Sequence, residues 1–530
     1  MTTYFQDFRE HLKALDGAGL LAKIDEPINK DAELMPLVRW QFRGLPEEER
    51  RAFLFTHVTD AKGRRHDIPV AVSCLAASRQ IYAFGFQCKP EEIVERWSRA
   101  EANPIPPVIL ASGPVHEEVH IGSSLTEKGG LGEFPIPIST PGFDCAPYTT
   151  ASHWFTKDPQ TGKINIGNYR GQVKSPTRTG VYIHSSNHGG YHWKKCKERG
   201  IPLQAALVIG APPAVAYTAP SRVPISVSEL DVAGGIAGRA VEVVRCKTID
   251  MVVPAYAEIV IEGEISTEYI EPEAPFGEAP GYIGEKMLNP YFDVKCITHR
   301  RDPIFAAIVS QFPPSESSKI KQLAAEGNYL RFLKDECNIP GILEVAFHEI
   351  AVRQICIIRM KKSNPAHVWQ ALHSVVGFHP ATGKIVIAVD DDINPRSLDS
   401  ILWALAFRMQ PHRDMLVVRN RTPSMDPSAA PPGKELEVSM HEMAGCSALL
   451  IDATRKWDYP PVSLPKREFM ERARQLWERL ELPKLRPQDP WYGYQLGSWS
   501  EEDEEEAQLA LRGEHYQTGE KRAKMRVPVK

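Results

Sequence analysis

The chain has 530 residues, of which 42% are hydrophobic and 25% charged, and its formal net charge is −4. This composition is typical of a globular protein with two to four domains, and it gives no support for a nucleic-acid partner or an anionic membrane surface. The N-terminus has no apolar signal-peptide core, and no run of about 18 apolar residues predicts a membrane span. The nine cysteines are scattered without a CxxC pair, which argues against a zinc knuckle, an Fe–S cluster or a disulfide scaffold. We therefore expect a cytoplasmic protein with reduced thiols.

The first 120 residues predict mixed α/β structure. Apolar residues recur at helical spacing between Phe5 and Leu15, and Gly17 is a suitable end for that helix. A second helix is expected from about residue 89, where Pro90 fits a first helical turn. A short strand is expected at 106–111.

Between about residues 125 and 310, short β-like runs follow one another with turn residues between most of them. This texture is typical of a β-barrel or sandwich. The runs are 180–184, 204–210, 214–218, 257–266, 292–300 and 303–311. In the run 257–266, three glutamates alternate with isoleucines, so we expect one largely polar face and one face toward a core.

Helical periodicity returns after residue 320. Residues 316–336 predict one long connecting helix, although Gly327 weakens the pattern. A helix (366–376), a strand (384–392), a helix (396–409) and a strand (415–420) then alternate, which favours a parallel α/β layer.

The last 50 residues differ from the rest. Four aromatic residues lie between Trp491 and Trp499, just before the acidic run 501–506. We expect the aromatic segment to dock on a neighbouring subunit or domain, because Trp and Tyr are enriched at interfaces. The alternative is a solvated, charged tail.

Common nucleotide-binding motifs do not fit this sequence. The Gly-Lys pair at 383–384 lacks the spacing of a phosphate loop, and residues 234–241 are not a GxGxxG fingerprint. Asp390, Asp391 and Asp392 follow a predicted strand and could bind Mg²⁺. A strand-to-helix turn with solvated acids and a helix cap is the more common structure.

The first residues of the candidate site along the chain are two polar residues near a glycine. Asn165 and Arg170 are five residues apart, so a straight strand would send them to opposite faces. Gly167 permits a β-bulge that would bring both to one side.

Three histidines and a glutamate follow. His184, His188 and His192 are four residues apart, but Gly189 and Gly190 argue against a single helical stripe of metal ligands. We expect one of these histidines to share a site with Asn165.

Glu229 follows a β-like run and the dipeptide Val-Ser. It is either a ligand or a helix-entry acid with Ser228 as the cap.

The segment "EAPFGEAPGY", residues 273–282, places Glu273 and Glu278 among Ala, Pro, Gly and aromatic residues. Its composition favours neither a helix nor a regular strand. It is either a solvated turn or a loop that holds two acids over a reaction centre.

The order and spacing of these pieces resemble the UbiD-like family of decarboxylases, which use prenylated FMN. Residues 165–170 look like the family's N-x-G-x-Y-R strand, and residues 273–278 look like its E-x-P-F-G-E loop. The resemblance extends from about residue 10 to 460. It implies an α/β (α+β, multidomain) architecture, whose expected parts are an N-terminal α/β domain (1–122), a flavin-reductase-like split β-barrel that binds prenylated FMN (123–315), a linker helix (316–340), a C-terminal α/β oligomerisation domain (341–482) and an extended charged and aromatic tail (483–530).

The resemblance also implies a metal and cofactor site. Asn165, His188 and Glu229 would hold a divalent metal that binds the flavin phosphate, Mn²⁺ first and Mg²⁺ or Fe²⁺ as alternatives. Backbone carbonyls from Ala219 to Arg222 would hold K⁺. The expected cofactor contacts are Asn165, Ile166, Gly167, Asn168, Tyr169, Arg170, Asn187, His188 and Glu229.

Three residues would carry the reaction by the same resemblance. Arg170 would hold the substrate carboxylate, Glu273 would hold Arg170, and Glu278 would protonate the product carbon. The apolar surroundings of Glu278 and the nearby acid would both raise its pKa. The flavin would be the electron sink. The pocket wall is expected to include parts of 312–321 and 441–451.

The implied function is reversible, non-oxidative decarboxylation of an aromatic acid or an aromatic acyl-CoA such as phthaloyl-CoA. A homodimer or homohexamer is expected, with a separate prenyltransferase supplying the cofactor. One alternative is a plain FMN oxidoreductase, but no nicotinamide-binding motif is visible. The other is a non-catalytic subunit of a multi-subunit carboxylase, which would have no reason to keep Arg170, Glu273 and Glu278 together.

Overall fold

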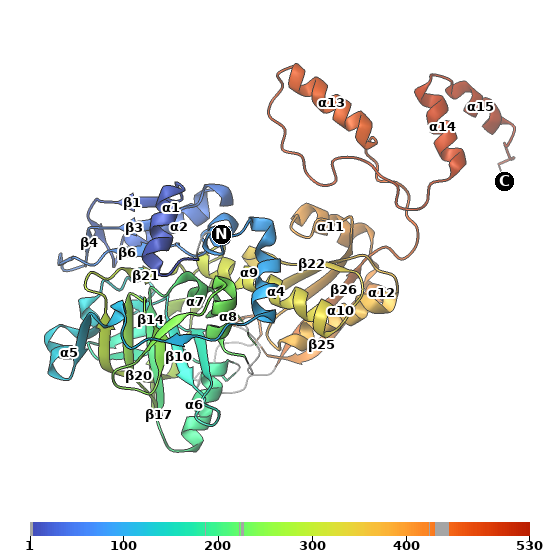
Figure 1. Ribbon diagram of the computed structural model, residues 1–530. Coiled ribbons are helices and arrows are strands. Elements are labelled where there is room, and N and C mark those ends of the chain that lie inside the picture. The colour runs from blue at the N-terminus through green and yellow to red at the C-terminus, as the bar shows by residue number, and fades with distance from the viewer. Residues whose placement is uncertain are drawn as a thin grey trace.

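The computed structural model describes residues 4–185, 187–221, 223, 227–422, 425–429 and 445–529. The N-terminal part (blue) lies against the central sheet (green), and the C-terminal sheet (orange) lies beside both, with α9 between them (Figure 1). Within these residues, no helix is both long and apolar enough to cross a membrane.

The N-terminal part is built on a four-stranded sheet. Its strands, in sheet order, are β1 (Leu21–Ile24), β3 (Ala52–Phe55), β6 (Val70–Val72) and β21 (Phe305–Ala307). Because β21 pairs in parallel with β6, the chain returns to this sheet after the barrel. The other elements are β2 (Ile28–Asn29), β4 (Val58–Thr59), β5 (Arg65–His66), α1 (Phe8–Gly17), α2 (Leu34–Gly44), η1 (Glu47–Glu49), α3 (Arg79–Gly85), η2 (Pro90–Glu92) and α4 (Ile93–Ala102). The predicted amphipathic α1 is confirmed, with Phe8, Leu12 and Leu15 buried.

The central part is a nine-stranded sheet. Its path runs through β11 (Ile164–Asn168), β10 (His153–Lys157), β14 (Leu203–Ile209), β17 (Ile259–Glu273), β20 (Met287–His299), β13 (Arg178–Gly180), β12 (Gly171–Ser175) and β9 (Tyr148–Thr149), and β8 (Glu118–Ile121) also pairs with β20. Only Tyr169 and Arg170 separate β11 from β12, although these strands lie near opposite ends of the path. The sheet must therefore curl until its two ends approach each other, and Arg170 lies where they meet.

Shorter elements surround this curled sheet. They are β7 (Val108–Ile109), η3 (Pro114–His116), α5 (Ser123–Glu127), η4 (Gly130–Glu133), α6 (His188–Glu198), α7 (Pro213–Thr218), α8 (Glu229–Ala237), β15 (Glu242–Arg245), β16 (Val252–Pro254), β18 (Phe276–Gly277) and β19 (Ile283–Gly284). The run 214–218 is helix α7, so its prediction as a strand was wrong. Every residue of α7 is buried, and a short apolar run buried all round has no periodicity to separate helix from strand.

Much of the polar face of the alternating run 257–266 is buried. Glu258 and Glu262 are both fully buried. The side chain of Arg9 donates two hydrogen bonds to Glu258, and Glu262 accepts hydrogen bonds from the backbone of Lys247 and Thr248. The polar face is therefore satisfied inside the protein.

The long helix predicted at 316–336 is confirmed as α9 (Glu316–Arg331), which continues into the π-helical turn η5 (Phe332–Glu336). Gly327 lies within α9, and a side-chain atom added there would lie 2.8 Å from Trp97 Cβ. A glycine at this position therefore permits the close approach of α9 to α4.

The C-terminal sheet has the order β22 (Ile342–Phe347), β23 (Ile355–Met360), β24 (Ile385–Asp390), β26 (Cys446–Ala453) and β25 (Met415–Arg421). The nearby helices are η6 (Glu349–Ala351), α10 (Pro365–Phe378), α11 (Leu398–Phe407) and α12 (Pro411–Asp414). The expected parallel layer holds for β23, β24 and β26. β25 instead pairs antiparallel with β26 at the edge, because the alternation of helix and strand does not fix the order of strands in space.

The aspartate cluster after β24 binds an arginine. Arg408, which is buried, lies 2.9 Å from Asp390 and 2.6 Å from Asp392. Ser397 caps α11. This geometry favours the structural interpretation of the cluster over a Mg²⁺ site.

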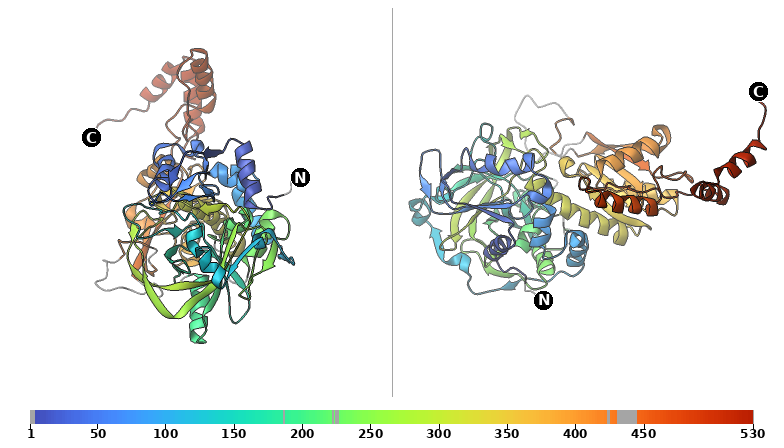
Figure 2. Two further views of the ribbon diagram at one scale, coloured as in Figure 1. Left: turned by 90° about the vertical axis from the view of Figure 1, so that its left-hand side faces the viewer. Right: turned by 90° about the horizontal axis from the view of Figure 1, so that it is seen from above.

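Three helices follow the C-terminal sheet. α13 (Arg467–Arg479) lies within the predicted C-terminal domain 341–482, and α14 (Glu501–Leu511) and α15 (His515–Ala523) lie in the tail 483–530. All three project away from the body (Figures 1 and 2), and none has a buried residue. Part of the aromatic segment packs on the C-terminal part of the same chain. Tyr494 donates a hydrogen bond to Asp392 at 2.8 Å, and Leu496 is buried.

Truncation after Lys484 is expected to lower the melting temperature by several degrees. It removes Tyr494 and Leu496, and burying an apolar side chain contributes about 1.5–3 kcal/mol. If the tail also docks on a second subunit, light scattering will report a smaller particle. Truncation after Arg512, which removes no buried residue among those that the structure describes, is the control. Unchanged melting and unchanged mass in both truncated chains would show that the tail is a solvated extension.

Candidate active site

Arg170 lies between the two glutamates singled out in the sequence. Its Nε and Nη2 donate to Glu273 at 2.9 and 2.5 Å, and its Nη1 contacts Glu278. The side chains of Arg170 and Glu273 are buried, and that of Glu278 is 12% exposed. The structure thus brings Arg170, Glu273 and Glu278 together, as expected.

Short strands hold the two acids in place. Glu273 ends β17, and Glu278 lies in the turn between β18 and β19, where its backbone N–H donates to Tyr282. The expectation that 273–282 contains no regular strand was therefore partly wrong. Proline and glycine limit strand length but still permit two paired residues on each side of a turn.

The surroundings of Arg170 are aromatic and largely dry. The guanidinium carbon lies 4.2 Å from the centroid of the Tyr182 ring and 5.3 Å from that of Phe276. Burial alone would lower the pKa of Arg170, but Glu273 outweighs burial and raises it. The positive charge is therefore permanent in an environment that strengthens its contacts with anions.

Asn289, which the sequence did not single out, supports the network of Arg170, Glu273 and Glu278. Its side-chain amide donates to Glu273 at 3.1 Å and is fully buried in β20. Nothing in the local sequence marks this asparagine. Only the pairing of β17 with β20 brings it beside Glu273.

Replacing Asn289 with Ala is expected to lower turnover about tenfold or more without loss of flavin. A hydrogen bond to a charged group contributes about 1.5–3 kcal/mol, and each 1.36 kcal/mol of transition-state stabilisation is a factor of ten in rate. The measurement is kcat with flavin absorbance as a loading check. Gln517→Ala, which removes an exposed side-chain amide in α15, is the control. Turnover equal in both variants would remove Asn289 from the network's support.

A second group of polar side chains converges at the other end of the 165–170 segment. His188 Nδ1 lies 3.1 Å from Asn165 Oδ1 and 3.9 Å from Glu229 Oε1. Glu229 and Asn165 are buried. An amide oxygen, an imidazole and a carboxylate at these distances form a suitable donor set for a divalent cation.

The path of the chain between Asn165 and Arg170 differs from the predicted β-bulge. The register of β11 with β10 is regular through Gly167, so the bulge prediction was wrong. The chain instead leaves β11 after Asn168, and Arg170 lies beyond the end of the strand. The ring of Tyr169 folds back over Gly167 and leaves no room for a side chain there.

Of the three histidines, His188 contacts Asn165. His188 is the first residue of α6, capped by Asn187, whose side chain accepts from Gly190 at 2.8 Å. His192 lies one turn later and contacts Thr156 at 3.0 Å. Burial lowers the pKa of His184. The glycines did not prevent a helix here, because they lie in its first turn.

Two helix N-termini meet at this donor set. Glu229 is the first residue of α8 and Ser228 caps it, so both interpretations of Glu229 hold at once. The dipoles of α6 and α8 favour a negatively charged group such as a phosphate beside these N-termini. Burial raises the pKa of Glu229 to about 8. A bound cation would reverse this shift, so the residues present fit a metal–phosphate group.

A cleft lies between the barrel and the C-terminal part. Its lining includes Ser221, Lys321, Arg353 and His379. Burial and, to a smaller extent, the neighbouring Arg353 together lower the pKa of Lys321 to about 8. Two partly buried cations that line the same site favour an anionic ligand. Lys321 belongs to the predicted pocket wall 312–321, whereas residues 441–444 of the other predicted wall lie outside the described residues.

The predicted K⁺ site can be followed only in part. Ala219 closes α7 as its C-cap, and Ser221 donates to the carbonyl of Thr218 at 2.6 Å. Arg222 lies outside the described residues.

Comparison with known proteins agrees with this geometry. Residues 108–313 match the model of the 3-octaprenyl-4-hydroxybenzoate carboxy-lyase Rift-related domain (UbiD), and residues 320–453 match the C-terminal domain of the same enzyme family (UbiD_C). The chain belongs to the UbiD family of carboxy-lyases. The resemblance found in the sequence and the α/β multidomain fold are thereby confirmed.

Solved UbiD-class structures cover nearly the whole chain. HmfF from Pelotomaculum thermopropionicum, in complex with prFMN, is 28% identical, with a TM-score of 0.72 over 87% of this chain and 97% of HmfF. The vanillic acid decarboxylase of Sedimentibacter hydroxybenzoicus is 25% identical, with a TM-score of 0.78 over 91% of this chain and all of that enzyme's chain. An uncharacterized protein of Archaeoglobus fulgidus is 30% identical over 477 residues, which are 86% of this chain and 92% of the relative.

Proposed function

We propose that this UbiD-family carboxy-lyase decarboxylates an aromatic carboxylic acid, or an aromatic acyl-CoA, reversibly and without net oxidation, using prenylated FMN. The observation that carries the proposal is the buried contact of Arg170 with both Glu273 and Glu278. Arg170 is five residues from Asn165, which belongs to the donor set that fits a metal–phosphate group. Five residues of extended chain span at most about 17 Å, which places both groups within reach of one flavin.

The cofactor would be held at its phosphate end. Asn165, His188 and Glu229 would bind a divalent metal, Mn²⁺ first, and the N-termini of α6 and α8 would face the phosphate. Residues 166–169 and Asn187 would line the flavin. When bound, a prenylated flavin supplies an electron sink for the carbon that loses CO₂. HmfF was solved with this flavin, which supports the assignment by similarity.

The geometry refines how Arg170 would meet a substrate. Glu273 uses the Nε–Nη2 edge of the guanidinium, so only the edge that carries Nη1 remains, and Glu278 contacts it. A substrate carboxylate would take that edge and displace Glu278. Glu278 would then lose its contact with the positively charged Arg170. A carboxylate that is shielded from water and has no cation beside it accepts a proton readily.

The chain's own residues would complete the reaction in a fixed order. Arg170 would hold the carboxylate in position while the C–C bond to CO₂ breaks, and a bound flavin would supply the electron sink for the pair left on carbon. The displaced Glu278 would then donate its proton to the carbon that carried the carboxylate. Carboxylation is the same sequence reversed, with Glu278 accepting the proton.

The cleft beside Ser221 supports an anionic ligand at the boundary with the C-terminal part. Lys321 and Arg353 would bind a phosphate of the cofactor or, in an aryl-CoA substrate, the diphosphate. An oligomer is proposed by similarity, since the HmfF structure in complex with prFMN is that of an evolved dimeric form.

The test is CO₂ release from a panel of aromatic acids and aryl-CoA thioesters. One sample of enzyme carries prenylated FMN, from co-expression with a prenyltransferase, and a matched sample carries FMN. We expect release from at least one substrate with prenylated FMN only. Hydride-dependent flavin reduction without CO₂ would favour the plain oxidoreductase, and a chain that binds neither flavin would favour a non-catalytic subunit.

A further inference from the structure

A second cluster of metal-binding residue types lies on elements that the proposed active site does not use. His120 comes from β8, His299 ends β20, and Glu133 ends η4. In the pairing of β8 with β20, His120 lies opposite Ile297, two residues from His299. Residues two apart on a strand share a face, so the two rings are diagonal neighbours on one side of the sheet.

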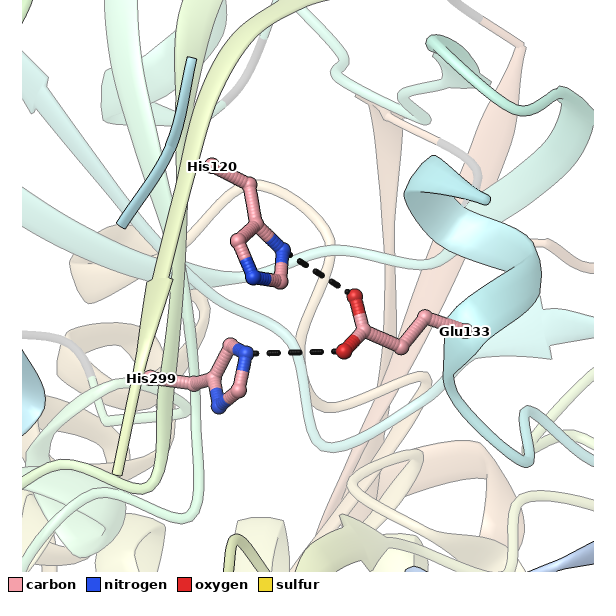
Figure 3. Close-up of side chains that lie close together, drawn as sticks. All are labelled: His120, Glu133 and His299. Atoms are coloured by element: carbon pink, nitrogen blue, oxygen red, sulfur yellow. Dashed lines mark ion pairs between the residues drawn. The ribbon is translucent and has the colours of Figure 1, made fainter. Parts of the chain in front are cut away.

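The three side chains converge. Figure 3 shows both imidazole rings turned toward the carboxylate of Glu133. His120 Nδ1 lies 3.1 Å from one oxygen of Glu133, and His299 Nε2 lies 3.6 Å from the other. Both histidines are 4% exposed, and one ligand atom from each residue lies within 4.8 Å of the others.

The hydrogen bonding of His299 determines what can lie between these atoms. Its Nδ1 is 2.6 Å from the carbonyl oxygen of Arg300, which can only accept, so Nδ1 carries the proton. In the neutral ring, Nε2 then presents a lone pair to a carboxylate oxygen. Two acceptors facing each other in a buried position repel unless a positive charge lies between them. Within the described residues, neither His299 Nε2 nor His120 Nδ1 meets the geometry of a hydrogen bond.

We propose that His120, Glu133 and His299 bind a divalent transition-metal ion, with Zn²⁺ as the best-fitting ion. Zn²⁺ binds imidazole nitrogen and carboxylate oxygen at about 2.0–2.2 Å, which separates neighbouring ligands in a tetrahedron by roughly 3.4 Å. The observed separations of 3.1 and 3.6 Å bracket that value. The Arg300 carbonyl holds the His299 ring in the way that second-shell partners orient metal-binding histidines.

The place of the site in the fold indicates a structural role. The ion would link β8 and η4 to β20, and the 21% exposure of the Glu133 side chain gives it a route from solvent and a position for a water ligand. Asn289 of the active-site network lies ten residues earlier on β20, about 30 Å along an extended strand. The proposal is therefore independent of the proposed function.

The competing explanation is a proton in place of the metal. Burial lowers the pKa of His299, but Glu133 and the Arg300 carbonyl outweigh burial and raise it. A protonated His299 paired with Glu133 would satisfy the same geometry. Zinc binding separates the two explanations directly.

The experiment compares zinc retention in full-length, flavin-loaded protein. Wild type, Glu133→Gln, His299→Gln and the control His373→Gln, which removes an exposed imidazole, are incubated with ZnCl₂ and desalted. Zinc is measured by mass spectrometry and flavin by absorbance. We expect wild type and the control to retain one zinc per chain more than the other two variants, with equal flavin in all four. Equal zinc in all four proteins would overturn the proposal.

A second measurement covers the case in which a variant folds poorly. Wild-type crystals soaked in ZnCl₂ are measured on both sides of the zinc absorption edge. An anomalous peak about 2 Å from the facing atoms of His120, Glu133 and His299 supports the site. A map without a peak there, from crystals that show zinc elsewhere, contradicts it.

Discussion

Replacing Glu278 with Gln is expected to lower the decarboxylation rate by about 10²–10⁴-fold, the contribution of a positioned acid. The substitution keeps the shape of the side chain and its apolar neighbours but removes the proton. Because Glu278 touches only the Nη1 edge of Arg170, the Arg170–Glu273 pair remains intact. Flavin content and substrate binding should therefore be retained. The measurements are kcat and solvent-deuterium incorporation into the product.

Two further variants accompany this experiment, one as a control and one as a test of Arg170. Glu285→Gln changes an exposed glutamate in the same hairpin and should leave turnover unchanged. Arg170→Lys should fail as completely as Glu278→Gln, because a point charge cannot serve Glu273 through two parallel hydrogen bonds and still meet a substrate carboxylate. Near wild-type turnover in Glu278→Gln, with the flavin spectrum confirmed, would mean that another group protonates the product.

Replacing His188 with Ala is expected to remove metal and flavin together. His188 lies 3.1 Å from Asn165 and 3.9 Å from Glu229, so its loss leaves two donors where the phosphate-binding ion needs three. Metal ligands and phosphate would form one cluster, and each would depend on the other. Metal content and flavin absorbance of the purified protein should both fall to near zero.

The matched control for His188 is on the same helix. His192→Gln changes a histidine one turn later that contacts Thr156, and it should keep both metal and flavin. Full flavin retention in His188→Ala would show that the donor set does not hold the cofactor. Loss of flavin in both variants with a fall in melting temperature would point to a damaged α6.

The sequence predicted the parts of the site that lie close together along the chain. Glu273 and Glu278 are five residues apart in a segment rich in Pro and Gly, so they remain close together in the folded protein. From the residues alone, one of His184, His188 and His192 was expected to share a site with Asn165, and the choice of His188 came from the family resemblance. The approach of Asn165 and His188 to Glu229 followed only from resemblance, since two helix N-termini and one strand must meet to produce it.

Other features could not be predicted because they depend on strand order. Asn289 reaches Glu273 through the pairing of β17 with β20, and β25 takes an antiparallel edge position that the helix–strand alternation does not encode. The cluster of His120, Glu133 and His299 is invisible in the sequence for the same reason. The predicted polar alternation was correct, but Glu258 and Glu262 on its polar face are buried, which the alternation alone does not encode.

The most direct test of the account is exchange of ¹³C between bicarbonate and the carboxyl group of the substrate. This exchange requires the C–C bond to break and re-form, but it does not require a proton on the product carbon. In enzyme loaded with prenylated FMN, we predict exchange in wild type, exchange without product in Glu278→Gln, and neither in Arg170→Lys. Product formation by Glu278→Gln at the wild-type rate, or exchange in Arg170→Lys equal to that of wild type, would contradict the roles assigned to these two residues.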